Sequence, residues 1–424
     1  MSRILLILTL IVSGEMVFGL PFHTNRYFRG TFLEVFGFTN TQLGDVFAVY
    51  GVLAMLCYFP GGALADRFSA RTLLTASLVA TAIGGLYMAT IPGVLGMAVL
   101  YGFFGISTIF LFWGALIRAA RDWGGASEQG MAFGLLEAGR GLVAASVAVG
   151  AAVMFAALMP ENVEQATDAE RRAAFQAVIL AYVAVALIAA AMCWFILEEP
   201  DARAPRPRDP FRGMATVIGR PVIWAQASII ICAYCAFKGF DNYGLYAQQV
   251  LGMNEAEANK ATAWGSYIRP VAAIAAGLIA DRFNAARSIL VVFGVLIVTY
   301  LPLSMLGAGS TFLILTNASI TLIAVFALRA VYFALLEENR TPVWYTGAAT
   351  GMVSFIGFSP EIFFGPITGR ILDASPGIEG FHNYFLFLAG VAAAGMLCVF
   401  WLLWLRSRGE ETLWPRVLAS ETKS

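Results

Sequence analysis

Apolar windows of about 20 residues recur along almost the whole chain, separated by short stretches rich in charges, glycine and proline. Each window is long enough for an α-helix to cross the roughly 30 Å hydrocarbon core of a bilayer. Only 13% of the 424 residues are charged, whereas a soluble domain carries roughly 25%. The pattern predicts an all-α integral membrane protein. Its twelve transmembrane helices are expected at 4–26, 42–62, 72–91, 94–118, 128–157, 173–197, 221–249, 257–280, 287–306, 311–336, 342–368 and 382–405.

The windows fall into two sets of six, with a polar segment between them in which prolines alternate with arginines. Such a composition is typical of a solvated linker. Glu15 interrupts the first window, which therefore indicates a membrane span and not a cleaved signal peptide. The expected division is a six-helix bundle at 1–197, a cytoplasmic linker at 198–220, a second six-helix bundle at 221–406 and a cytoplasmic tail at 407–424.

The basic residues predict the orientation, because Lys and Arg near the ends of spans are retained on the cytoplasmic side. With both termini inside, 17 basic residues fall on the inner side and six on the outer side, Arg26 and Arg29 among the six. Both termini are therefore expected in the cytoplasm, with the chain crossing the cell's inner (plasma) membrane many times.

The two sets of windows also repeat in sequence. Gly-Ala-Leu-Ala-Asp-Arg at 62–67 follows the second window, and Gly-Leu-Ile-Ala-Asp-Arg at 277–282 follows the eighth, so Asp66 and Asp281 lie 215 residues apart. Gly130 and Gly134 recur as Gly347 and Gly351 at an offset of 217, and close helix packing is expected at both pairs. A duplicated six-helix unit explains both offsets, so the fold is expected to be two pseudo-symmetric halves.

The repeated Gly-x-Leu-Ala-Asp-Arg loop resembles the signature loop of the major facilitator superfamily, over essentially the whole chain. The resemblance implies that Asp66 docks at the start of the 342–368 span, near Thr341, when the protein opens outward, with Asp281 docking at the 128–157 span by symmetry. The alternative is that the arginines of these loops only fix the orientation of the helices across the membrane. The candidate gating residues are Asp66, Arg67, Arg71, Asp281, Arg282 and Arg287.

Charged residues inside the windows are the most informative feature, because a charge at mid-bilayer costs about 2.5 kcal/mol or more. The windows at 72–91, 173–197, 287–306 and 382–405 have uncharged interiors. The resemblance implies that these four face lipid and that the other eight line a central cavity. The charged residues within those eight are Glu15, Glu137, Arg140, Lys238, Asp241, Arg269, Arg329 and Glu361.

Lys238 lies at the position in the second half that corresponds to His23 in the first. This segment is loosely similar to that of organophosphate/phosphate antiporters, in which paired basic residues bind the anion. The alternative is that Asp241, one turn away, neutralises Lys238. The candidate substrate-binding residues are His23, Asn25, Arg140, Lys238, Asn242, Tyr243, Arg269 and Arg329.

Arg269 and Arg329 have no acidic residue within one helical turn, so they are expected to attract anions unless Glu15 or Glu361 pairs with them across helices. Glu137 and Arg140, three residues apart, form either a switch or a structural pair. Intramembrane carboxylates are candidates for proton coupling, with Glu15 favoured over Glu361. The candidates for proton coupling are Glu15, Glu137, Asp241 and Glu361.

Other classes of function have little support. The net charge is zero, which argues against nucleic-acid binding, and the five cysteines lie in apolar windows. The sequence contains no nucleotide-binding loop and no catalytic motif, so no cofactor, metal ion or enzymatic activity is expected. The sequence predicts a monomeric, proton-coupled secondary transporter that moves a small organic anion (carboxylate, sulfonate or phosphate ester) by alternating access. The alternatives are a sugar or polyol transporter, a drug/proton exporter and a membrane receptor without transport.

Overall fold

The computed structural model describes residues 3–65, 67–124, 129–198, 214–272, 275, 284–305, 311–341 and 343–409. The described elements are all helical. Those of the first half are α1 (Arg3–Met16), η1 (Gly19–His23), α2 (Thr24–Tyr27), α3 (Arg29–Phe36), α4 (Asn40–Ala65), α5 (Ala70–Met88), α6 (Val94–Gly105), η2 (Ile106–Trp113), α7 (Gly114–Gly124), α8 (Gln129–Leu158), η3 (Val163–Gln165) and α9 (Asp168–Ile196). Those of the second half are α10 (Met214–Ile218), α11 (Pro221–Gly239), η4 (Phe240–Asn242), α12 (Tyr243–Gln249), α13 (Glu255–Gly265), α15 (Ala285–Leu303), α16 (Thr311–Val331), η5 (Tyr332–Ala334), α17 (Leu335–Glu338), α18 (Val343–Gly357), α19 (Pro360–Ala374) and α20 (Ile378–Ser407).

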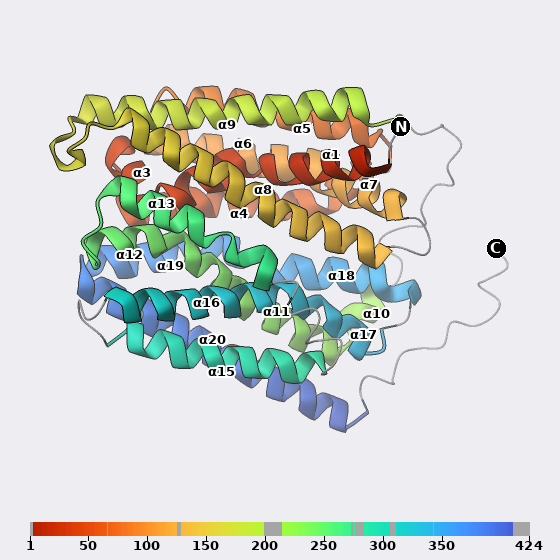
Figure 1. Cartoon of the computed structure of the whole chain (residues 1–424). Coiled ribbons are helices and arrows are strands. Elements are labelled where there is room, and N and C mark those ends of the chain that lie inside the picture. Colours follow the sequence, from red (N-terminus) through yellow and green to blue (C-terminus); the bar gives the residue numbers. More distant parts are fainter. Residues whose placement is uncertain are drawn as a thin grey trace.

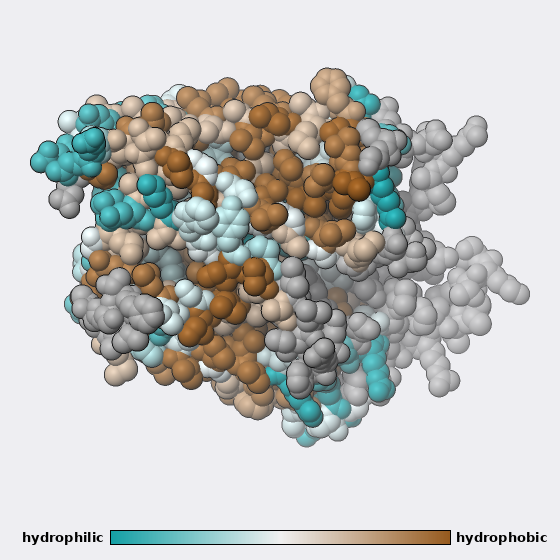
Figure 2. Space-filling view, in the orientation of Figure 1, coloured by the Kyte–Doolittle hydropathy of each residue, from teal (hydrophilic) through white to brown (hydrophobic). Residues whose placement is uncertain are grey.

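Eight of the described helices are long and apolar enough to cross a membrane, and the bent pair formed by α1 with η1 and α2 makes nine. In Figure 2 brown apolar residues predominate over the middle of the visible face, and teal hydrophilic residues gather toward its ends. Large apolar side chains are exposed, with Leu95 80% and Phe195 79% accessible, as expected for contact with lipid tails. The predicted all-α membrane fold is confirmed.

The two sets of helices form two layers. In Figure 1 the red-to-yellow helices of the first half lie above the green-to-blue helices of the second. The chain's first described residue, Arg3, and the end of α20 lie at the same end of the molecule, which we call the terminal end. The start of α4 and the start of α13 lie at the opposite end, which we call the distal end.

Several predicted spans are interrupted, and local chemistry explains where. The first span breaks after Met16 and bends by 42°, with Pro21 inside the π-helical segment that follows. The span predicted at 342–368 is two helices, because α18 ends at Gly357 and Pro360, which lacks an N–H, begins α19. Proline is favoured at the first helical position for this reason.

Helix starts at the distal end are fixed by side chains. Thr167 and Glu170 form a reciprocal capping box at the start of α9, and Asn254 and Glu257 form one at the start of α13. Such caps satisfy backbone N–H groups that have no partner within the helix.

The expected close approach at Gly134 and Gly351 is wrong in this structure, because a Cβ added at either meets no described atom within 4 Å. The close approach lies elsewhere, between α4 and α19. A Cβ added at Gly44 would overlap the backbone of Gly365, and one added at Gly369 would overlap the backbone of Asn40. Small residues allow helix backbones to touch, so glycines bring the two halves into contact near the distal end.

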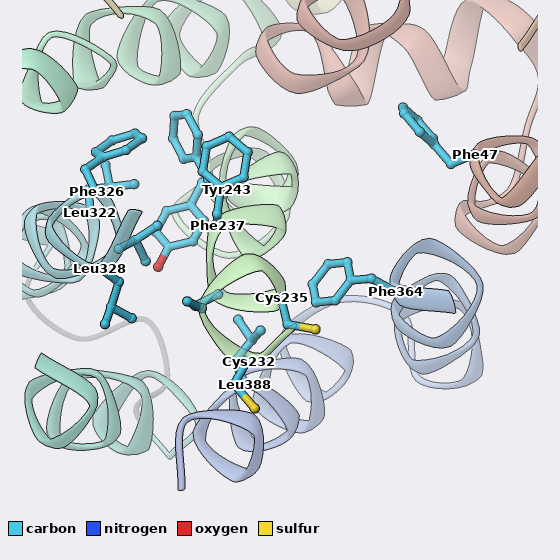
Figure 3. Packing of buried hydrophobic residues seen from close by; sticks show 14 of the residues in the cluster. Phe47, Cys232, Cys235, Phe237, Tyr243, Leu322, Phe326, Leu328, Phe364 and Leu388 are labelled. Carbon is cyan, nitrogen blue, oxygen red and sulfur yellow. The ribbon is translucent and has the colours of Figure 1, made fainter. Parts of the chain in front are cut away.

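The cysteine pair in α11 belongs to the apolar core. Figure 3 shows Cys232 and Cys235 close to Phe364 and Leu388, and both cysteines are buried and free. Among the described residues no group of His, Cys, Asp and Glu has the geometry of a metal site.

Candidate functional site

An open cavity lies between the two halves, and the space within it, including space open to solvent, is about 820 Å³. In the part of the chain that the structure describes, its wall comes from the spans predicted to carry charge or to line a cavity, and no lining residue belongs to α5, α9, α15 or α20. Those four helices are the uncharged windows of the sequence, so the predicted division between cavity helices and outer helices agrees with the observed wall.

Glu15 is at the centre of the first charged group. Its carboxylate lies 3.2 Å from His23 Nε2, 3.1 Å from Arg140 Nε and 3.5 Å from Arg269 Nη1. The break after α1 permits the contact with His23, which is eight residues further along the chain. Glu15 thereby joins helix α8 of the first half to Arg269 of the second.

Glu137 completes this group, which we call the Glu15 cluster (Glu15, His23, Glu137, Arg140 and Arg269). Its carboxylate lies 2.6 Å from Arg140 Nη1 and 3.5 Å from Arg269 Nη2. The internal pairing of Glu137 with Arg140 is therefore present. The cross-helix pairing that the sequence left open for Arg269 is also present, so Arg269 is not an isolated cation.

Lys238 is at the centre of the second group. Its Nζ lies 3.1 Å from Asp241 Oδ2 and 3.2 Å from Glu361 Oε2. The neutralisation by Asp241 that the sequence offered as an alternative is thus observed. Tyr234 donates a hydrogen bond to Glu361 as well. Glu361 contacts Lys238 and also lines the cavity.

Arg26 belongs to the same group, which we call the Lys238 cluster (Arg26, Tyr234, Lys238, Asp241 and Glu361). Arg26 Nε lies 2.5 Å from Asp241 Oδ1, and its guanidinium stands over the ring of Phe237 at 4.8 Å. The sequence placed Arg26 and Arg29 on the outer side, at and just beyond the end of the first span, and the structure shows both to be buried, with 6% and 5% accessible. The helical chain continues past the first predicted span through α2 and α3, which bury both.

Arg329 differs from the other cavity cations. Its guanidinium lies over the ring of Phe237 at 4.3 Å, and Nη1 is buried with no hydrogen-bond partner among the described residues. Arg329 lines the cavity and makes no hydrogen bond to a carboxylate among the described residues, although Glu137 acts on it electrostatically.

The remaining candidates lie outside this cavity. Asn25 and Asn242 line a second, smaller cavity next to Lys238. Tyr243 lines neither of the two cavities. It packs against Phe240 and Phe385, at ring-centroid distances of 5.9 Å each, and Figure 3 shows it in the apolar core.

The predicted gating residues are described only in part. Asp66, Asp281 and Arg282 lie outside the described residues. Arg67 and Arg287 are exposed, and Arg71 stacks over Trp194 of its own half at 4.2 Å. Docking of these loops on the opposite half remains a prediction.

Contacts between the halves gather instead at the distal end. Asp373, in α19, accepts hydrogen bonds from the backbone N–H groups of Asn40 and Thr41 at 3.1 and 2.6 Å, and so caps α4. Arg370 makes a bidentate pair with Asp45 at 2.8 and 3.2 Å. We call these two contacts the distal latch (Asn40, Thr41, Asp45, Arg370 and Asp373).

The site is therefore a charged cavity between two six-helix layers, which contact each other through the ion pairs of the cavity and at the distal latch. This arrangement defines the class of membrane transporters with a central site. The family model described as Major Facilitator Superfamily matches residues 11–362. The chain belongs to the major facilitator superfamily of secondary transporters, which confirms the resemblance seen in the sequence.

Curated relatives match almost end to end. The chain is 27% identical over 403 residues to "Inner membrane protein YqcE" of Escherichia coli, covering 92% of each chain. It is 25% identical over 397 residues to "Inner membrane protein YihN" of the same organism, covering 91% of this chain and 92% of the relative.

Solved structures share the fold at low sequence identity. A point mutant of the nucleoside transporter NupG superposes with a TM-score of 0.73 at 12% identity, over 94% of this chain and 99% of its own. A bacterial homologue of the human lysosomal transporter Spinster, in an inward-facing and unoccupied conformation, superposes with a TM-score of 0.72 at 14% identity, over 94% and 97%.

Proposed function

We propose that this protein moves a small organic anion across the inner membrane by alternating access, coupled to protons, with both termini in the cytoplasm. The membrane assignment follows the printed names of the two E. coli relatives. The orientation rests on the excess of basic residues on the side of the termini.

Arg329 is the observation that carries the anion proposal. The Glu15 cluster, the Lys238 cluster and Arg329 together contain five basic residues and four acids. The basic residues are Arg26, Arg140, Lys238, Arg269 and Arg329, and the acids are Glu15, Glu137, Asp241 and Glu361. With His23 neutral, one positive charge remains in excess, and Arg329 is the member with an unpaired nitrogen among the described residues. An uncompensated guanidinium in a low-dielectric cavity favours a carboxylate, sulfonate or phosphate oxygen as its partner.

The rest of the wall suits a carbon skeleton. Aromatic rings from both halves line the cavity, including Phe22, Tyr50 and Trp113 from the first half and Tyr234 and Phe358 from the second. Such rings bind apolar parts of a ligand by burying apolar surface and by edge-to-face contacts. The proposed substrate therefore combines one acidic group, bound at Arg329, with an organic body against the aromatic wall.

A neutral polyol or sugar is the second candidate, and the pairing of the other cations favours it. Arg140, Lys238 and Arg269 each have carboxylate partners within 3.5 Å, so these three offer no free charge to an anion. In this alternative Arg329 only stabilises Phe237 through its cation–π contact.

A ligand screen separates the two candidates. The thermal unfolding midpoint of the detergent-purified protein is measured with carboxylates, sulfonates, organic phosphates, sugars and polyols, and then repeated on Arg329→Gln. Arg287→Gln is the matched control, because Arg287 is exposed. Ligand at 100 times its Kd stabilises the folded state by about 2.7 kcal/mol.

Stabilisation by an anion that is lost in Arg329→Gln and kept in Arg287→Gln supports the proposal, and names the compound for uptake into liposomes. Stabilisation by a neutral compound that persists in Arg329→Gln, with no effect of any anion, overturns it in favour of the polyol.

A further inference from the structure

A second, much smaller cavity adjoins the Lys238 cluster and reaches the crossing of α4 and α19. Lys238, Asp241 and Glu361 form one side of it, and Gly44 and Gly365 form another part of its wall. Glu361 lines this cavity and the central one. The second cavity therefore lies between the central cavity and the distal contact of the two halves.

Arg29, on the wall of this cavity, is a buried cation whose hydrogen-bond partners are neutral. It is 5% accessible, and its two terminal nitrogens donate to Asn25 Oδ1 at 3.1 Å and Asn40 Oδ1 at 3.2 Å. Its Nε is buried with no hydrogen-bond partner among the described residues. A buried guanidinium N–H without an acceptor is unfavourable, so an acceptor group is expected beside Nε.

The acids on this cavity are in direct contact with other cations, although Asp241 and Asp373 also act on Arg29 electrostatically. Asp241 is held between Arg26 at 2.5 Å and Lys238 at 3.1 Å, and Glu361 is held by Lys238 at 3.2 Å. The wall of the second cavity holds two basic residues and two acids. Because Asp241 also pairs with Arg26, which lies outside this wall, Arg29 has no carboxylate to itself. A second buried atom on this wall, Asn242 Oδ1, also has no hydrogen-bond donor among the described residues. A water molecule bound beside an anion would supply that donor.

We propose that the second cavity binds one small monovalent anion, chloride or a carboxylate group, at the unpaired Nε of Arg29. The inference does not depend on which substrate occupies the central cavity. The site is also connected to the distal latch, because Asn40 accepts from Arg29 and donates to Asp373 at 3.1 Å. Anion binding at Arg29 is thus expected to strengthen the distal contact.

The test uses chloride and acetate as probes. The full-length protein is purified at constant ionic strength in the sodium salt of MES, whose anion is a bulky sulfonate and not a carboxylate. The unfolding midpoint is recorded as MES is replaced by chloride or by acetate. Wild type is compared with Arg29→Gln, Arg29→Lys and Arg329→Gln. Arg172→Gln is the control, because Arg172 is an exposed arginine at the start of α9, at the distal end.

The expected result is a saturable rise in the midpoint for wild type, Arg172→Gln and Arg329→Gln, and none for Arg29→Gln. Arg29→Lys keeps the charge without the Nε donor, so its apparent affinity should fall about tenfold, the typical effect of losing one charge-assisted hydrogen bond. Acetate as effective as chloride identifies the ligand as a carboxylate group, and an effect of chloride alone identifies a halide site.

Three results overturn the proposal. The first is an equal rise in Arg29→Gln, and the second is the absence of a rise with both probes in wild type. The third is a rise that Arg329→Gln abolishes and Arg29→Gln leaves intact, which places the anion in the central cavity. If Arg29→Gln does not fold, Arg29→Lys decides instead, and an affinity for chloride or acetate equal to that of wild type overturns the proposal. The organic-anion proposal is judged separately, by the response of Arg329→Gln to substrates.

Discussion

Arg26 and Asp241 form an ion pair of 2.5 Å between residues that lie 215 positions apart, the same offset that relates Asp66 to Asp281 in the repeated loop. In a molecule built from two related halves, equivalent residues near the pseudo-twofold axis face each other. Here the two copies have opposite charges, so the equivalents attract. His23 and Lys238 are also equivalents, and each contacts an acid, Glu15 and Glu361 respectively.

This pair should contribute strongly to the association of the halves. Removing one partner of a buried ion pair leaves a charge without compensation, which costs about 3–5 kcal/mol. We predict that Asp241→Ala lowers the free energy of unfolding by this amount and that Arg26→Met combined with Asp241→Leu recovers much of it. The measurement is an unfolding titration with SDS in mixed micelles.

The control is Asp122→Asn, whose partner is Arg118 at 3.8 Å on the surface. An exposed pair is worth about 1 kcal/mol or less, so this variant should change little. Equal, small losses in Asp241→Ala and Asp122→Asn would contradict a stabilising role for the Arg26–Asp241 pair.

Local spacing predicted part of the site well. Lys238 with Asp241, and Glu137 with Arg140, are three residues apart, and such neighbours meet on one face of a helix. The partner of Arg26 could not be predicted in this way, because no acidic residue lies within one helical turn of it in the sequence. The available signal was the repeat itself, since adding 215 to 26 gives an acid, Asp241. Contacts between helices without such symmetry, as between Lys238 and Glu361, depend on packing that no local pattern encodes.

Glycine contact between α4 and α19 should control closure at the distal end. Any side chain at Gly44 overlaps the backbone of Gly365, so Gly44→Leu is expected to separate the two helices there. We predict that the distance between spin labels at Thr90 and Glu379, both exposed at the distal end, shifts to longer values. The measurement is pulsed EPR in a background with the five native cysteines replaced.

Gly390→Leu provides the matched control, because a Cβ at Gly390, in α20, meets no described atom within 4 Å. Its distance distribution should match that of the unsubstituted protein. The same distribution in Gly44→Leu would show that α4 and α19 are not what holds the distal end closed.

Glu34, at the end of α3, should make stability depend on pH. Burial, with the negative charge of Glu255 adding to it, raises the pKa of Glu34 from 4.5 to about 7, against the opposing effect of Arg171 at 3.2 Å. Asp168 lies close enough to raise it further. Between pH 4.5 and 7 the unfolded chain has released this proton while the folded protein still holds it, so stability should fall as pH rises through this range and level off above it.

We predict that Glu34→Gln flattens this decline when the unfolding midpoint is followed from about pH 4.5 to about pH 8, a range that brackets the raised pKa. Glu161→Gln, at an exposed distal position, should keep the wild-type profile. A decline of the same size in Glu34→Gln would assign the pH dependence to another group.

Proton coupling is the last property that the charged groups suggest, and they favour Glu361 over Glu15. Protonating Glu15 would weaken contacts to three partners, His23, Arg140 and Arg269. Protonating Glu361 would weaken one ion pair, with Lys238, and that lysine keeps Asp241 at 3.1 Å. The lower electrostatic cost makes Glu361 the better candidate for reversible protonation during a transport cycle.

We predict that Glu361→Gln retains exchange of the identified substrate between equal concentrations but loses its accumulation against a gradient when a pH difference is imposed on liposomes. A neutral side chain at this position no longer releases or takes up a proton. Substrate movement should therefore continue without the proton movement that drives accumulation. Asp45→Asn, which removes a carboxylate from the distal latch, should keep pH-driven accumulation. If accumulation survives in Glu361→Gln and disappears in Glu15→Gln, the coupling belongs to Glu15. The variant that keeps exchange and loses accumulation is the one whose substituted residue carries the proton.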